Sequence, residues 1–158
     1  MSSKPRLLLA FILAVLLASL LASIFQTQTN LAALQALGAP MPLDVRVGTT
    51  CLDLLGFAPT FALLSALGFL LALPLAAGLA RRMPALRWLI FVLAGAAAIW
   101  AALALANALA PMPTLIAADR SPFGTLGLMA CGSVGALLFG LLGRRVRYRT
   151  QPTSSDSL

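Results

Sequence analysis

The fold of this chain is decided by four apolar runs, the first of which, Leu7–Phe25, reads LLLAFILAVLLASLLASIF. Three further runs follow at Pro59–Ala80, Trp88–Ala110 and Phe123–Gly143. None of the four contains an Asp, Glu, Lys, Arg or His residue. Because a bilayer core about 30 Å thick needs about 20 apolar residues per helix, each run is long enough to cross a membrane. The sequence therefore predicts an all-α, polytopic membrane protein built as a four-transmembrane-helix bundle.

The composition agrees with this interpretation. Of the 158 residues, 61% are apolar and 9% are charged, and the mean hydropathy is +0.99. Soluble domains carry about 25% charged residues. Since the four runs take up more than half of the chain, little sequence is left for a soluble domain.

The basic residues indicate an orientation. Arg46 and Arg120 lie after the first and third runs, whereas the other nine Lys and Arg residues lie in the alternate gaps. These nine are Lys4, Arg6, Arg81, Arg82, Arg87, Arg144, Arg145, Arg147 and Arg149. The positive-inside rule then predicts that both termini are cytoplasmic, an N-in/C-in topology. We interpret the net charge of +7 as this topology signal, because no basic face interleaved with aromatic residues is present to bind nucleic acid.

The gaps divide the chain into a cytoplasmic N-terminus (1–6), the transmembrane domain (7–143) and a basic, then disordered cytoplasmic tail (144–158). The longest gap, the outer segment 26–58, is rich in apolar residues, so we expect it to lie in the interface or to cap the bundle from outside.

We expect the first run to be retained rather than cleaved as a signal peptide. It is longer than the 7–15 apolar residues of such peptides and lacks a small-residue cleavage site.

Within the outer segment, Asn30 is placed to cap a short helix, Leu31–Leu37, which Gly38 would end. Pro59 suits the first turn of the second span, where its missing N–H costs nothing. Pro74 lies inside that span, and we expect a kink there.

Small residues recur every fourth position along the spans. The first span carries Ala10, Ala14, Ala18 and Ala22. The fourth carries two such rows, Gly127, Cys131, Gly135 and Gly132, Ala136, Gly140. Rows of this kind let helix backbones approach closely in lipid, although an alanine-rich chain also produces them by chance. The fourth span is the one we expect to be packed most centrally.

Polar residues gather in the two outer gaps and at the span ends that adjoin them. The candidate outer-rim cluster is Asn30, Asp44, Arg46, Asp53, Asn107, Asp119 and Arg120. Asp44 or Asp53 could pair with Arg120, and Asp119 with Arg46. We interpret these residues as ordinary loop charges and helix caps, because exposed pairs contribute about 0–1 kcal/mol. The alternative is a site for a small anionic or zwitterionic ligand.

The last span is followed by four arginines, Arg144, Arg145, Arg147 and Arg149. We interpret them as the charge that orients the final helix. The alternative is contact with anionic lipid headgroups, which is worth about 1 kcal/mol per basic residue. The two cysteines, Cys51 and Cys131, lie in the outer gap and inside the fourth span, so we expect two unpaired thiols.

The sequence lacks the residues that most catalytic and ion-coupling mechanisms need. It has no histidine and no glutamate, and its spans hold no acid or base for a proton relay. We therefore predict no catalytic residue, no metal site and no cofactor, and we do not expect an enzyme or an ion-coupled carrier. The favoured function is a non-enzymatic scaffold or accessory subunit that packs against other membrane proteins or itself. The Gly- and Ala-rich spans are typical of a bacterial inner membrane protein.

The alternative function is a channel or facilitator for a small molecule or lipid, with its entrance at the outer face. Such a protein needs a continuous polar path through the bundle. The residues available to line that path are Thr60, Ser65, Asn107, Thr125 and Ser133.

Overall fold

The computed structural model describes residues 3–109 and 121–148. It is all-helical over these residues, and four of its helices are long and apolar enough to cross a membrane. They are α1 (Ser3–Ala36), α2 (Leu43–Arg82), α3 (Arg87–Leu109) and α4 (Pro122–Tyr148), and a single 3-10 turn, η1 (Pro84–Leu86), joins α2 to α3. This confirms the predicted class, an all-α protein with four apolar helices.

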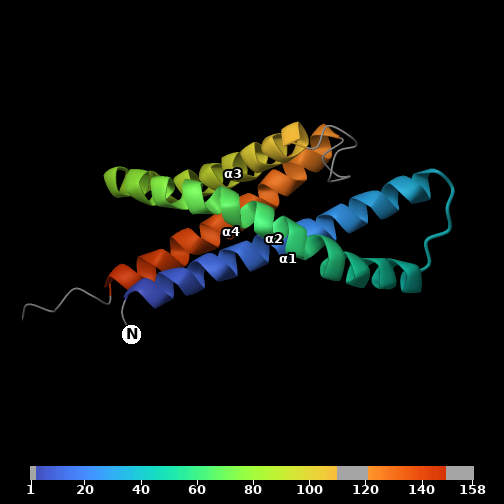
Figure 1. Cartoon of the computed structure of the whole chain (residues 1–158), viewed down its shortest axis with the longest axis horizontal. Coiled ribbons are helices and arrows are strands. Elements are labelled where there is room, and N and C mark those ends of the chain that lie inside the picture. The colour runs from blue at the N-terminus through green and yellow to red at the C-terminus, as the bar shows by residue number, and fades with distance from the viewer. Residues whose placement is uncertain (1–2, 110–120, 149–158) are drawn as a thin grey trace, which may run out of the picture.

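The helices run up and down in chain order (Figure 1). Each helix packs along its two neighbours in the order α1, α2, α3, α4, and α4 closes the ring against α1. The N-terminus therefore lies at the same end of the bundle as the end of α4, and the α1–α2 connection lies at the opposite end (Figure 1).

The starts of the third and fourth helices agree with the sequence. The third span was expected from Trp88 and α3 begins at Arg87; the fourth was expected from Phe123 and α4 begins at Pro122. Proline at the first helical position is favoured, because its missing N–H has no partner within the helix at that point. Helix α4 then continues beyond Gly143 as far as Tyr148.

The expected break after the first span is wrong. Helix α1 runs without interruption through Asn30 to Ala36, so Asn30 does not cap a separate helix. The polar run that starts at Gln26 contains no glycine or proline, and its hydroxyls bond back to the helix itself. Thr27 Oγ1 lies 2.9 Å from the Ser23 carbonyl oxygen and Thr29 Oγ1 2.9 Å from that of Phe25, an arrangement that a helix accommodates.

Gly38 ends α1 as predicted. Its φ is +86°, a left-handed conformation that glycine adopts without a steric penalty. The Gly38 N–H donates to the Gln35 carbonyl at 3.0 Å and the Ala39 N–H to the Leu34 carbonyl at 3.2 Å. These bonds satisfy the last carbonyls of the helix, as in a glycine C-cap.

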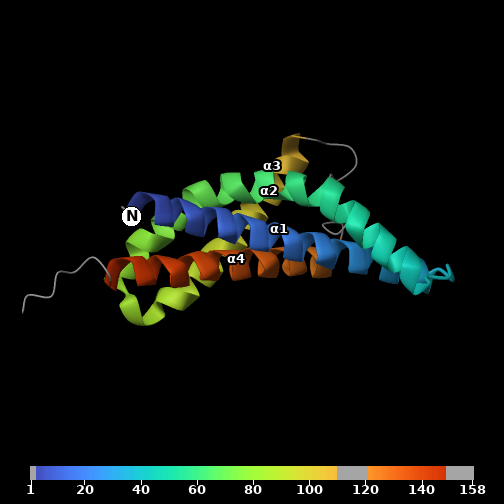
Figure 2. The same ribbon diagram turned by 90° about the horizontal axis from the view of Figure 1, so that it is seen from below.

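The placement of Pro59 in a first turn is also wrong. Helix α2 begins at Leu43, preceded by Pro42, and contains both Pro59 and Pro74. Both prolines lie on the exposed face of α2, so the backbone bonds that they remove are on the side away from the bundle. Figure 2 shows α2 bowed over the other helices, and helices commonly curve with their convex side outward.

As a result, most of segment 26–58 is helix that continues the first two spans. At 1.5 Å per residue, α1 is about 50 Å long and α2 about 60 Å. The rings of Phe25 on α1 and Phe123 at the start of α4 lie 6.0 Å apart. Residues of α1 beyond Phe25 therefore extend past the first residues of α4. Figures 1 and 2 show the α1–α2 connection well beyond α3 and α4. We call residues 27–57 the projecting hairpin.

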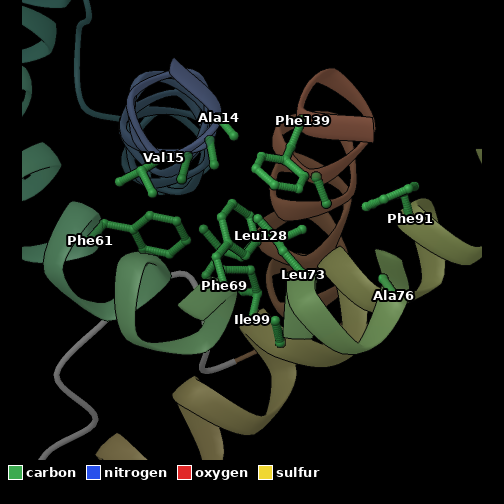
Figure 3. Close-up of a cluster of buried hydrophobic side chains, with 14 of the residues drawn as sticks. Ala14, Val15, Phe61, Phe69, Leu73, Ala76, Phe91, Ile99, Leu128 and Phe139 are labelled. Atoms are coloured by element: carbon green, nitrogen blue, oxygen red, sulfur yellow. The ribbon is translucent and has the colours of Figure 1, made fainter. Parts of the chain in front are cut away.

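Aromatic and branched side chains fill the core of the bundle (Figure 3). Phe61 and Phe69 on α2, Phe91 and Ile99 on α3, and Leu128 on α4 are all 1% exposed or less. Helix α1 contributes mainly alanine to this core; Ala14, Ala18 and Ala22 are fully buried, and Ala10 is 3% exposed. Small residues on one helix thus meet rings from another, which supports close packing in lipid, where dispersion rather than the hydrophobic effect holds helices together.

Candidate functional site

The structure distributes the predicted outer-rim residues along the molecule. Asp44, Arg46 and Asp53 lie on α2 and Asn30 on α1, all in the projecting hairpin, whereas Asn107 lies near the end of α3. Asp44 and Asp53 are nine residues apart, about 14 Å along the helix, so they do not form one compact site. Asp119 and Arg120 lie outside the described residues, and the ion pairs expected for them stay predictions.

Hydrogen bonds join the two helices of the hairpin along its length. Thr27 Oγ1 lies 2.7 Å from Asp53 Oδ2, and Gln28 Nε2 donates to Thr50 Oγ1 at 3.4 Å. Nearer the tip, Arg46 Nη2 donates to Gln35 Oε1 at 3.0 Å. Arg46 therefore has a neutral amide as its partner in the structure.

The same seam continues into the bundle. Ser19 Oγ lies 3.5 Å from Ser65 Oγ, and both residues are buried. Ser19, Ser23 and Thr27 are spaced by four residues on α1, and they are 2%, 0% and 0% exposed. We call these three residues, together with Ser65 and Asp53 on α2, the polar seam.

Two buried polar atoms on α1 have no hydrogen-bond partner among the described residues. They are Ser23 Oγ and Gln26 Oε1, on residues that are 0% and 8% exposed. A buried polar group without a partner costs about 1–3 kcal/mol. Most native proteins contain few such groups, so each one needs an explanation.

The two small-residue rows of α4 meet different neighbours. A Cβ added at Gly135 would lie 2.6 Å from the Ala14 carbonyl oxygen on α1, and one at Gly127 would overlap the Phe25 ring. A Cβ at Gly132 would overlap the Ile99 side chain on α3, and one at Gly140 would lie 2.6 Å from the Phe91 ring. Helix α4 is thus in close contact with α1 through one row and with α3 through the other.

An arginine that was expected only to orient the chain also joins two helices. Arg87 Nη2 donates to the Gly140 carbonyl at 2.9 Å, and its guanidinium lies over the Phe91 ring, 5.2 Å from the ring centre. Because Gly140 has no side chain, both the ring and the guanidinium can approach the backbone of α4. The contact fixes the start of α3 against the end of α4.

The remaining candidates lie apart from these contacts. Arg144, Arg145 and Arg147 are in the last turns of α4, and Arg149 is outside the described residues. Cys51 is exposed, Cys131 is partly buried, and both are free thiols, as expected.

The polar residues proposed for a transport path lie on separate surfaces. Ser65 contacts Ser19 between α1 and α2, whereas Ser133 Oγ lies 2.9 Å from the Val92 carbonyl oxygen between α4 and α3. Thr60 is exposed, and Thr125 Oγ1 donates to the Ser121 carbonyl at 3.1 Å.

No family model matches the chain, and neither a curated protein nor a solved structure matches it significantly.

Sequence reasoning singled out Asp53 and Arg46 but not their partners. Thr27 and Gln35 carry no charge, so they did not stand out among the polar residues that follow the first span. The spacing of Ser19, Ser23 and Thr27 was a usable signal, because residues four apart share one helix face.

Proposed function

We propose that this chain is a non-enzymatic scaffold or accessory subunit of a membrane assembly, and that the projecting hairpin contacts its partner. The observation that carries the proposal is the apolar surface of a helix pair that extends past the bundle. Leu37, Leu43, Leu52 and Leu55 are 84%, 77%, 70% and 78% exposed. Exposed apolar surface that extends beyond the rest of a protein is suited to contact with a partner.

The interior of the bundle supports the same proposal. Phe61, Phe69, Leu73 and Phe91 fill the space between the helices and are at most 1% exposed. The polar residues that a facilitator would need belong to different helix pairs. A tightly filled interior and an exposed apolar hairpin favour assembly over passage of a solute.

We further propose that the protein lies in a bacterial inner membrane, with the hairpin on the outer side and both termini in the cytoplasm. The positive-inside distribution of arginine supports this orientation. The exposed thiol of Cys51 provides a native probe. A membrane-impermeant maleimide should label Cys51 in intact spheroplasts, and Cys51→Ser should abolish the signal. Labelling only after the membrane is permeabilised would contradict the orientation.

The partner contact is tested by purification from native membranes in mild detergent, with a tag at the C-terminus. Leu52→Ala combined with Leu55→Ala should reduce recovery of co-purifying protein at least tenfold, while the yield of the folded chain is unchanged. The matched control is Leu71→Ala with Leu75→Ala, two α2 leucines that are 73% and 75% exposed but lie beside the bundle. A monodisperse monomer without partners would contradict the proposal.

A further inference from the structure

The polar seam presents one face of α1 to α2. Ser19 meets Ser65, and Thr27 meets Asp53 two turns later. Ser23 lies midway between them with the same spacing, so it faces α2 as well. Its hydroxyl is fully buried and has no hydrogen-bond partner in the part of the chain that the structure describes.

Two oxygen atoms lie within hydrogen-bond distance of Thr27 Oγ1. Thr27 has a single hydroxyl hydrogen, yet its Oγ1 lies 2.7 Å from Asp53 Oδ2 and 2.9 Å from the Ser23 carbonyl oxygen. Both of those groups accept hydrogen bonds when Asp53 is ionised. Gln26 Oε1, on the preceding residue, is a further buried acceptor without a donor.

The carboxylate of Asp53 also lacks a countercharge among the residues that the structure describes. Thr27 is its side-chain partner there, and the nearest arginine on the same helix, Arg46, donates to Gln35 instead. Asp53 is partly buried. A positive group close to this partly buried carboxylate would stabilise it.

We propose that Asp53, Thr27 and Ser23 form a binding site for a small monovalent cation, either an alkali metal ion or an ammonium group. Carboxylate, hydroxyl and carbonyl oxygens are the ligands that hard cations prefer. One carboxylate balances one positive charge, whereas a divalent ion would leave an excess charge partly buried. The bound cation supplies the missing partner of Ser23 Oγ and links α1 to α2.

The position of the site allows a cation to enter from water. Thr27 lies two residues beyond Phe25, whose ring contacts Phe123 at the start of α4. The site therefore lies at the rim where the hairpin leaves the bundle. This inference does not depend on the proposed function as a subunit.

The test is thermal unfolding of the purified full-length chain in detergent, followed by the fluorescence of Trp88 and Trp100. Sodium, potassium or ammonium chloride is titrated against choline chloride at constant ionic strength. We expect a saturable rise in Tm of about 5–10 °C at one hundred times the Kd. The three salts distinguish an alkali ion from an ammonium group.

Two variants and one control make the test specific. Asp53→Asn keeps an acceptor for Thr27 but removes the charge, and it should abolish the dependence on the cation. Ser23→Ala should raise the half-saturating concentration about tenfold and provides the readout if Asp53→Asn fails to fold. Asp44→Asn, at an exposed acid of the same helix, should behave like the natural chain.

Three outcomes would overturn the proposal. One is a Tm that is the same in all four salts. The second is a cation dependence that survives in Asp53→Asn. The third is a Ser23→Ala variant whose half-saturating concentration equals that of the natural chain.

Discussion

The two ends of α1 are packed in different ways. In the bundle, alanine and glycine bring α1 and α4 into backbone contact, with Gly135 against Ala14. In the projecting hairpin, α1 meets α2 through polar pairs such as Thr27 with Asp53. The first kind of packing suits lipid, where close contact is the main source of stability. The second continues towards the tip, where water competes for exposed bonds such as that of Arg46 with Gln35 and lowers their value.

If this comparison is correct, the largest effects should come from the glycines of α4. Gly135→Val places a branched side chain against the backbone of Ala14 and the Cβ of Ala18, at 2.6 and 2.9 Å from the added Cβ. Neither neighbour is a flexible side chain that can move aside. We expect a loss of about 3 kcal/mol in the free energy of unfolding, measured by unfolding in SDS followed by circular dichroism.

The control is Gly78→Ala on α2, since nothing lies within 4 Å of a Cβ at that position. It should be neutral, or stabilising by up to about 1 kcal/mol through helix propensity. Equal losses at Gly135 and Gly78 would show that close packing does not hold α4 in place.

The next largest effect is expected at the other end of the bundle. Arg87→Gln removes the charged donor to the Gly140 carbonyl and the cation over the Phe91 ring. We expect a loss of about 2 kcal/mol, because hydrogen bonds to charged groups contribute more than neutral ones. The measurement is the same SDS unfolding.

Arg81→Gln is the matched control for Arg87→Gln, since Arg81 is an exposed arginine near the same end of the bundle. It should change stability little. A similar loss at both positions would indicate that net charge, rather than the contact between α3 and α4, is responsible.

The four spans could be predicted from sequence because exclusion of charge reports directly on burial in lipid. The outer ends of α1 and α2 could not, since hydropathy indicates where a helix enters water and not where it ends. Gln26 and Asn30 are polar but do not break a helix, and Pro59 is tolerated where its missing hydrogen bond faces outward. Of these residues, only Gly38, with its left-handed φ, lies where a helix ends.

The site was less predictable because its contacts depend on how α1 is aligned with α2. Asp53 was recognised by its charge, yet it was expected to pair with an arginine across two loops. Which residue of α1 opposes Asp53 is set by the continuous helices and the length of the turn between them. Both became known only with the structure.

A smaller effect is expected in the polar seam. Thr27→Val preserves the shape of the side chain but removes the hydroxyl next to Asp53 Oδ2. Because Thr27 is fully buried, we expect a loss of about 1–2 kcal/mol in the free energy of unfolding. Thr29→Val is the control, since the Thr29 hydroxyl bonds to its own helix, at the Phe25 carbonyl. A loss of equal size at Thr29 would mean that the hydroxyl of Thr27 supports α1 rather than the contact with α2.

The smallest effect is expected at the tip of the hairpin. Arg46→Ala removes the bond to Gln35 Oε1, which lies in an exposed part of the molecule. Water replaces both partners there, so we expect a change below about 0.5 kcal/mol in the free energy of unfolding. The double-mutant cycle with Gln35→Ala measures the pair itself and should give a coupling close to zero.

A coupling as large as the effect of Thr27→Val would mean that α1 and α2 are held together equally tightly along the whole hairpin. The tip would then be a rigid extension of the bundle. A coupling near zero instead leaves the side chains of the tip available to a partner without a cost to the fold.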